Sequence, residues 1–110
     1  MARITLSFSN IAGDIPTYEF TKFQLDNSNF LEEQLNLSND KVFVCFQSWK
    51  NEIYKLQHST FLITSSIEDA LLWYEDYIKN INCNEIDFNF FGFESFEEAF
   101  EYCADLKEGL

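Results

Sequence analysis

The side chains with the clearest chemical potential are carboxylates near the end of the chain. Glu97, Glu101, Asp105 and Glu108 follow one another at i, i+4, i+8 and i+11, a spacing that places them on one face of a helix. Neighbours in such a row lie about 6 Å apart, and successive phosphates of a nucleic-acid strand are separated by a similar few ångströms. The row can therefore bind lysines and arginines of a basic protein by imitating a phosphate backbone. The alternative is a solvated outer face that only keeps the domain soluble.

A second acidic group precedes this row, and aromatic residues accompany both. Trp73 and Tyr102 fall beside the apolar stripes of their helices, where a ring can anchor an interface while carboxylates meet arginine. Each ring has the alternative of packing within the monomer. The sequence thus predicts a partner-binding set formed by Glu68, Asp69, Trp73, Glu75, Asp76, Glu97, Glu101, Tyr102, Asp105 and Glu108.

Catalytic groups are sparse. His58 is the only histidine, and Cys45, Cys83 and Cys103 form no CxxC pair. No glycine-rich phosphate loop and no hydrolase or metalloprotease motif is present. We therefore expect a protein that is not an enzyme, with no catalytic residue, no cofactor and no metal.

One pattern resembles a calcium-binding loop. Asp87, Asn89, Gly92, Ser95 and Glu98 occupy positions 1, 3, 6, 9 and 12 of an EF-hand. Position 5 breaks the pattern with a phenylalanine, and the alternating phenylalanines of this segment favour a strand. A calcium sensor remains a minor alternative.

The charged residues are distributed unevenly along the chain. The chain has 110 residues and a formal net charge of −12; residues 66–110 carry 12 acids and 2 bases, whereas residues 1–65 carry 7 acids and 5 bases. Such a field repels nucleic acid and anionic membranes and speeds encounters with basic proteins. In composition, being small, acidic and rich in aromatics, the chain resembles immunity proteins against nuclease toxins and phage proteins that block nucleic-acid-targeting defence. That resemblance implies an inhibitor of a nuclease or an RNA-guided effector.

Compartment and domain number follow from simple counts. Three cysteines without a framework fit a reducing compartment, and the N-terminus lacks the apolar core of a signal peptide. No apolar run reaches the ~20 residues that span a bilayer. We expect one domain over residues 1–110, located in the cytoplasm.

Periodicity predicts the elements that position these groups. Alternating apolar residues indicate strands at 4–8, 18–25, 53–56, 61–63 and 86–90, and the apolar run 42–46 indicates a central strand. Ser28 can cap a short helix with Phe30, Leu31 and Leu35 inward. Two longer helices follow, each with a serine cap and an acid three residues on. The first begins after Ser65 or Ser66 and points Ile67, Ala70, Leu71, Tyr74, Ile78 and Ile81 inward; the second begins after Ser95 and points Phe96, Ala99, Phe100, Cys103 and Leu106 inward.

These elements predict an α+β fold. We expect one mixed, mostly antiparallel sheet of five to six strands, with the two C-terminal helices packed on one face as a two-layer sandwich. Strands at 61–63 and 86–90 could pair in parallel around the intervening helix. A second hypothesis for function is a non-catalytic oligomerising or scaffolding domain, in which the strand from Ile86 to Phe93 or an edge of the sheet pairs with another copy.

Overall fold

The computed structural model describes residues 2–10, 13–49, 57–80 and 85–108. Within these ranges the chain forms four strands and four helices. Their order is β1 (Arg3–Ser9), α1 (Thr17–Asp26), α2 (Ser28–Ser38), β2 (Val42–Trp49), β3 (Gln57–Thr64), α3 (Ile67–Asn80), β4 (Glu85–Phe93) and α4 (Phe96–Glu108).

The described strands form one sheet in the order β1-β4-β2-β3, and every neighbouring pair is antiparallel. The α+β class and the antiparallel sheet are therefore confirmed, while the predicted count of five to six strands is not matched. The proposed parallel pairing of β3 with β4 is wrong, because β2 lies between them. The strand predicted at 53–56 lies outside the described residues.

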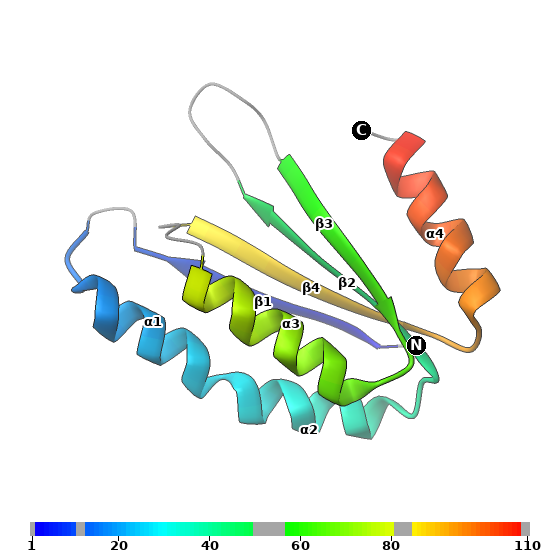
Figure 1. The fold of residues 1–110 in the computed structure, drawn as a ribbon, viewed down its shortest axis with the longest axis horizontal. Coiled ribbons are helices and arrows are strands. Elements are labelled where there is room, and N and C mark those ends of the chain that lie inside the picture. Colours follow the sequence, from blue (N-terminus) through cyan, green and yellow to red (C-terminus); the bar gives the residue numbers. More distant parts are fainter. Residues whose placement is uncertain (1, 11–12, 50–56, 81–84, 109–110) are drawn as a thin grey trace.

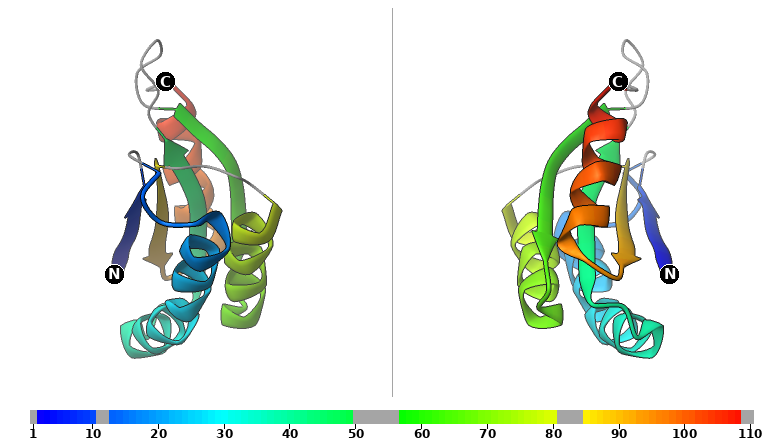
Figure 2. Two further views of the ribbon diagram at one scale, coloured as in Figure 1. Left: turned by 90° about the vertical axis from the view of Figure 1, so that its left-hand side faces the viewer. Right: turned by 90° about the vertical axis from the view of Figure 1, so that its right-hand side faces the viewer.

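Helices cover both faces of the sheet. Helices α1, α2 and α3 lie on one face and α4 lies on the other (Figure 1). The predicted arrangement, with both C-terminal helices on the same face, is wrong. The sheet is instead the middle layer between two helical layers, as the side views show (Figure 2).

Two hydrophobic cores result, one on each face. The main core joins α1, α2 and α3 to the sheet and includes Phe43, Tyr74 and Phe88. The small core under α4 contains Val42, Val44, Phe46, Ala99 and Cys103. Strand β2 contributes to both, which explains its continuous apolar run: alternate residues point to opposite faces, and here each face is covered.

The segment predicted as a strand at 18–25 is helix α1. Pro16 precedes it with φ −54°, and proline is favoured at helix starts because its fixed φ suits the first turn. Phe20 and Gln24 are buried and lie four residues apart, which is a helical and not a strand spacing. The Tyr74 hydroxyl donates to the Gln24 carbonyl oxygen over 2.6 Å in the buried layer between α1 and α3.

The predicted short helix is present as α2, but the predicted Ser28 cap is wrong: Ser28 is the first residue of the helix and Asn27 occupies the N-cap position. Leu31 and Leu35 are buried as predicted, but Phe30 is 48% exposed, so its predicted inward position is wrong. Helix α2 ends at Ser38, and the next residue, Asn39, adopts a left-handed conformation with φ 62°. This conformation suits asparagine better than most residues.

Helix α3 confirms its predicted start and inward face. The Ser66 hydroxyl accepts a hydrogen bond from the Asp69 backbone N–H over 3.2 Å, which satisfies one of the unpaired N–H groups of the first turn. Ala70, Tyr74 and Ile78 are buried. Ile67 and Leu71 pack against the main core, while Ile81 lies outside the described residues.

Candidate protein-binding surface on helix α4

Helix α4 is held against the sheet by its small residues and one tyrosine. The Ser95 hydroxyl accepts a hydrogen bond from the Glu98 N–H over 3.3 Å, which confirms the predicted cap. The Glu98 carboxylate accepts from the Glu94 N–H over 3.2 Å. Ala99 is fully buried and Cys103 is nearly so, and this lets the helix approach the sheet closely.

Tyr102 fixes the rotation of α4 about its own axis. Its ring centroid lies 5.4 Å from those of both Phe91 and Phe93 on the underlying strand. Desolvation by burial raises the pKa of the Tyr102 hydroxyl, and the positive charge of Arg3 partly opposes this. Tyr102 therefore packs in the small core. Its predicted role as a partner anchor would require its ring to leave Phe91 and Phe93.

The predicted acidic row lies on the outer side of α4. Glu97, Glu101 and Asp105 are all exposed, and no ion pair joins them to any side chain that the structure describes. Glu108 belongs to the same helix, but its side chain is outside the description. Among the side chains that the structure describes, the row thus presents negative charge to solvent.

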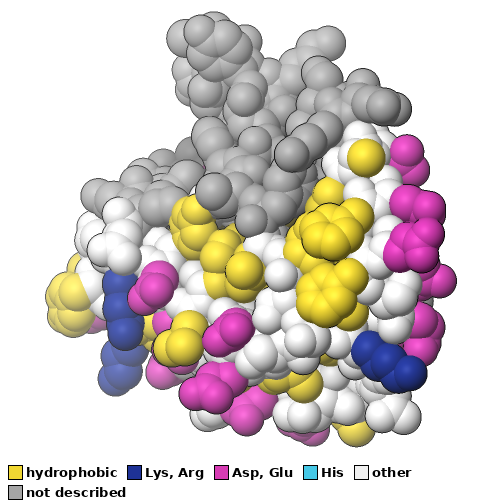
Figure 3. Space-filling view, turned by 45° about the vertical axis from the view of Figure 1, so that its right-hand side comes forward, with side chains coloured by type: hydrophobic (Ala, Val, Ile, Leu, Met, Phe, Trp, Pro, Cys, Tyr) yellow, Lys and Arg dark blue, Asp and Glu magenta, His cyan; other side chains and the backbone are white. Residues whose placement is uncertain are grey.

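An aromatic pair lies next to this row. Phe96 and Phe100 were predicted to face inward, and this is wrong: they are 45% and 58% exposed. Their rings stack on each other, with centroids 6.2 Å apart and an interplanar angle of 30°. Helical geometry separates Phe100 from Glu97 by only about 60° around the axis. Figure 3 shows hydrophobic side chains grouped beside a column of acidic ones on this side of the molecule.

The exposed pair arises because α4 is rotated relative to the predicted stripe. The predicted stripe included Phe96, Ala99, Phe100, Cys103 and Leu106, of which the Leu106 side chain lies outside the described residues. The face that packs on the sheet is instead formed by Ala99, Tyr102 and Cys103. Two small residues four positions apart are the sequence signal for this, since they mark where a helix contacts a sheet most closely. Sequence reasoning therefore missed Phe96 and Phe100 as surface residues.

The acids of α3 do not extend the α4 surface. Glu68, Asp69 and Asp76 are exposed, while the Glu75 carboxylate accepts a hydrogen bond from the Ser28 hydroxyl over 2.8 Å. Because α3 packs on the main core and α4 on the small core, the two acidic groups lie on opposite faces of the sheet. They cannot contact one flat partner surface together.

Trp73 belongs to the α3 side of the molecule as well. Its ring packs edge-on against Phe88 at 6.0 Å and Phe90 at 5.8 Å, and Tyr77 lies 5.0 Å away. It is partly buried against the main core. This placement matches the alternative in which Trp73 packs within the monomer, so we leave it out of the candidate surface.

The described cysteines are not arranged for nucleophilic chemistry. Burial raises the pKa of the Cys45 thiol to about 12, so the thiol stays protonated near neutral pH and is a poor nucleophile. Cys103 is buried in the small core. Cys83 and the side chain of His58 lie outside the described residues.

The residues of the calcium pattern do not surround a common point. Asp87 and Asn89 lie on the extended strand β4, where they project along a line and are not wrapped into a loop. Across the described ranges, no group of three or more His, Cys, Asp or Glu side chains is placed to hold a metal ion.

Comparison of the chain with protein-family models, with curated proteins and with solved structures finds no match. None of the helices in the described part of the chain combines the length and the apolar character that crossing a membrane requires.

Proposed function

We propose that this chain is a small acidic inhibitor that binds a basic, nucleic-acid-binding protein through the outer face of α4. The observation that carries the proposal is the pairing of two features on one helix face. Glu97, Glu101 and Asp105 form an exposed acidic row, and the stacked rings of Phe96 and Phe100 lie beside it.

This combination fits the groove of a protein that binds a nucleic-acid strand. Such grooves combine a basic track for phosphates with aromatic side chains on which bases stack. The carboxylates would meet the basic track, and the phenyl rings would take the place of stacked bases. The target class expected from the sequence, a nuclease toxin or a phage-defence effector, has grooves of this kind.

The charge distribution supports fast binding to such a target. With a net charge of −12, the chain repels nucleic acid and draws in a basic surface, which raises the association rate at low ionic strength. Salt screens exposed charges with a Debye length of about 8 Å at physiological ionic strength. The association rate should therefore fall steeply between 50 and about 300 mM salt.

The test is a reversal of the acidic row, with a matched control. The variant Glu97→Lys, Glu101→Lys, Asp105→Lys is compared with Glu68→Lys, Asp69→Lys, Asp76→Lys, which makes the same change in net charge on the opposite face. Binding is measured by biolayer interferometry against a target that is captured from host lysate, identified, and then purified.

We expect the α4 variant to lose at least about 100-fold in affinity, because three attractive contacts become repulsive, and to lose inhibition of the target's nuclease activity. The α3 variant should lose only the part due to long-range attraction. Equal losses of affinity in both variants would show that only the net charge matters. Unchanged affinity in the α4 variant would exclude the outer face of α4 as the binding surface.

A further inference from the structure

Among the described residues, strand β1 forms an open edge of the sheet. It pairs with β4 on one side, in unbroken register from Arg3 opposite Phe91 to Ser9 opposite Glu85. It is the first strand in the sheet order, and in both side views it lies at the outer margin of the sheet (Figure 2).

The backbone groups on this edge can be assigned from one hydrogen bond. The Gly92 N–H donates to the Ala2 carbonyl over 3.0 Å, and hydrogen-bonded pairs alternate along an antiparallel ladder. Even-numbered residues of β1 therefore exchange hydrogen bonds with β4. The N–H and C=O groups of Arg3, Thr5 and Ser7 point outward, away from the sheet.

Strand β1 lacks the devices that usually protect an edge. Natural edge strands carry proline, bulges or several charges that prevent pairing. The seven residues of β1 include no proline and no acid, their register with β4 has no bulge, and Arg3 is the single charged residue. An edge of this kind is a template for another strand.

We propose that a second copy of this chain occupies the edge, with β1 antiparallel to β1 about a two-fold axis at Thr5. The two four-stranded sheets would join into one, through about six backbone hydrogen bonds contributed by the outward groups. Each Arg3 would then lie opposite Ser7 of the second copy.

A local pair of opposite charges favours a second copy over an unrelated strand, and it acts against the general repulsion between two chains of net charge −12. Ser7 is paired within its own sheet with Asp87, so Arg3 of one copy and Asp87 of the other would lie two strands apart on the same face. Strands are spaced by about 4.8 Å, which puts the two Cα atoms about 10 Å apart, within reach of an Arg–Asp ion pair. In the single copy the Arg3 guanidinium lies over the Phe91 ring, 5.7 Å from its centroid, so it would turn from this ring toward the edge to form the ion pair. The two-fold axis makes this contact twice.

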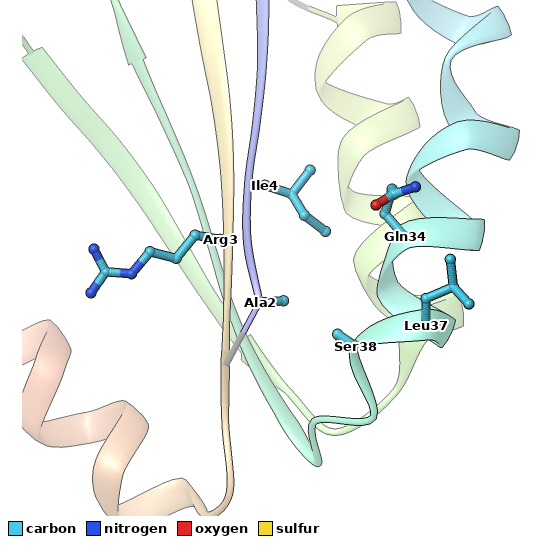
Figure 4. Close-up of a pocket in the computed structure, with 6 residues that line it drawn as sticks. All are labelled: Ala2, Arg3, Ile4, Gln34, Leu37 and Ser38. Carbon is cyan, nitrogen blue, oxygen red and sulfur yellow. The ribbon is translucent and has the colours of Figure 1, made fainter.

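The opposite face of the edge offers a complementary pocket of about 270 Å³ between β1 and α2. In Figure 4, Ile4 and Leu37 lie on the pocket side, while Arg3 points away from it. In the proposed register Phe8 of the second copy lies opposite Ala2. Phe23 packs on Phe8 at 5.9 Å and is 57% exposed, and Leu37 is 71% exposed. The dimer would bring Phe23 toward this pocket and cover both residues.

This inference is independent of the proposed function, because it uses another part of the molecule. Helix α4 contacts β2, β3 and β4, so its outer face would remain open in the dimer. One dimer would then present two copies of the acidic and aromatic surface.

The first test is sedimentation of the intact chain from about 1 to 500 μM. We expect a concentration-dependent dimer, and we expect Thr5→Pro to raise its dissociation constant at least about tenfold, because proline removes an outward N–H from each copy. The bonds between β1 and β4 do not use that N–H. The Thr5 hydroxyl donates to the Asn89 side chain over 3.0 Å, so Thr5→Ala is the control for losing that contact, and circular dichroism checks the fold.

The second test exchanges the two charges. Arg3→Asp and Asp87→Arg should each weaken the dimer several-fold, and the double variant should restore it at an unchanged net charge. Within one copy Arg3 lies opposite Phe91 and Asp87 lies opposite Ser7, so the two charged residues are four positions apart along the sheet. Restored dimerisation in the double variant would therefore report on a contact between copies.

Either of two results overturns the proposal. One is a monomer at every concentration, including the case in which that monomer binds a synthetic strand peptide at the edge, because the edge would then serve a different partner. The other is a dimer that is insensitive to Thr5→Pro and to the charge exchange, because its interface would lie elsewhere.

Discussion

Replacing the exposed aromatic pair with serine should weaken target binding without unfolding the protein. In the double variant Phe96→Ser, Phe100→Ser, the buried residues Ala99 and Cys103 and the partly buried Tyr102, which attach α4 to the sheet, are unchanged. The rings stack only partly on each other and leave 45% and 58% of their surface in solvent. The monomer therefore gains little from them, whereas a partner that covers them gains their burial.

The magnitude follows from the exposed area. A phenylalanine side chain buries about 200 Å² when fully covered, so the two exposed fractions together leave roughly 200 Å² available. At about 25 cal/mol per Å², complete burial in the complex contributes up to about 5 kcal/mol, and half burial about 2.5 kcal/mol. We expect the double variant to bind at least about fiftyfold more weakly, since 1.4 kcal/mol corresponds to a factor of ten.

Titration calorimetry at low and high salt measures this effect and separates it from charge. The contribution of the rings should persist at about 0.5 M salt, where the contribution of the carboxylates is screened. The matched control is Phe30→Ser, Leu72→Ser, because these side chains are 48% and 51% exposed on the other helical layer. If the α4 variant binds as tightly as the control at both salt concentrations, the rings are not part of the interface.

Two further predictions concern the stability of the fold. Gly92→Ala should lower the free energy of unfolding in urea by about 2 kcal/mol, because the new Cβ would collide with the Asp40 carboxyl group and lie 2.7 Å from the Asp40 Cβ. Adding Asp40→Gly, which removes all of these atoms, should recover part of the loss, and an unaffected single variant would contradict the contact. Burial raises the Cys45 pKa from 9.0 to about 12, so the folded state retains its proton and stability should fall between pH 9 and 10 by about 1 kcal/mol. Cys45→Ala should show a flatter profile over this interval, and identical slopes would refute the assignment.

Strong local signals made part of the fold predictable from the sequence. The apolar run at β2 and the serine caps of α3 and α4 combine a clear period with a specific start signal, and all three are where they were expected. In each case the local preference and the tertiary packing agree. The acidic row on α4 was predictable for the same reason, since carboxylates at this spacing have no place in a core.

Helix α1 was predicted as a strand because its sequence is rich in residues that favour strands. Tyr18, Phe20 and Phe23 favour strands intrinsically, yet Phe20 is buried whereas Tyr18 and Phe23 are 72% and 57% exposed. The buried polar residue Gln24 completes the helical face but carries no apolar signal. Packing against α3 decided the structure against local preference.

The position of α4 could not be derived from its own sequence. Its apolar residues cover a wide arc, and only contact with the sheet determines which part of the arc is buried. The strand beneath it presents Phe91 and Phe93, which Tyr102 covers, so the large rings of Phe96 and Phe100 are displaced to the surface. The same contact covers the second face of β4.

The division of the interior by the sheet has a consequence for how such a protein can change over generations. Most of the buried hydrophobic residues lie on the side of α1, α2 and α3, whereas the cluster under α4 has five buried residues. Substitutions on the outside of α4 leave the larger assembly of side chains untouched. The outer residues of α4 could therefore be substituted repeatedly, as a changing partner surface would require, while the rest of the fold is retained.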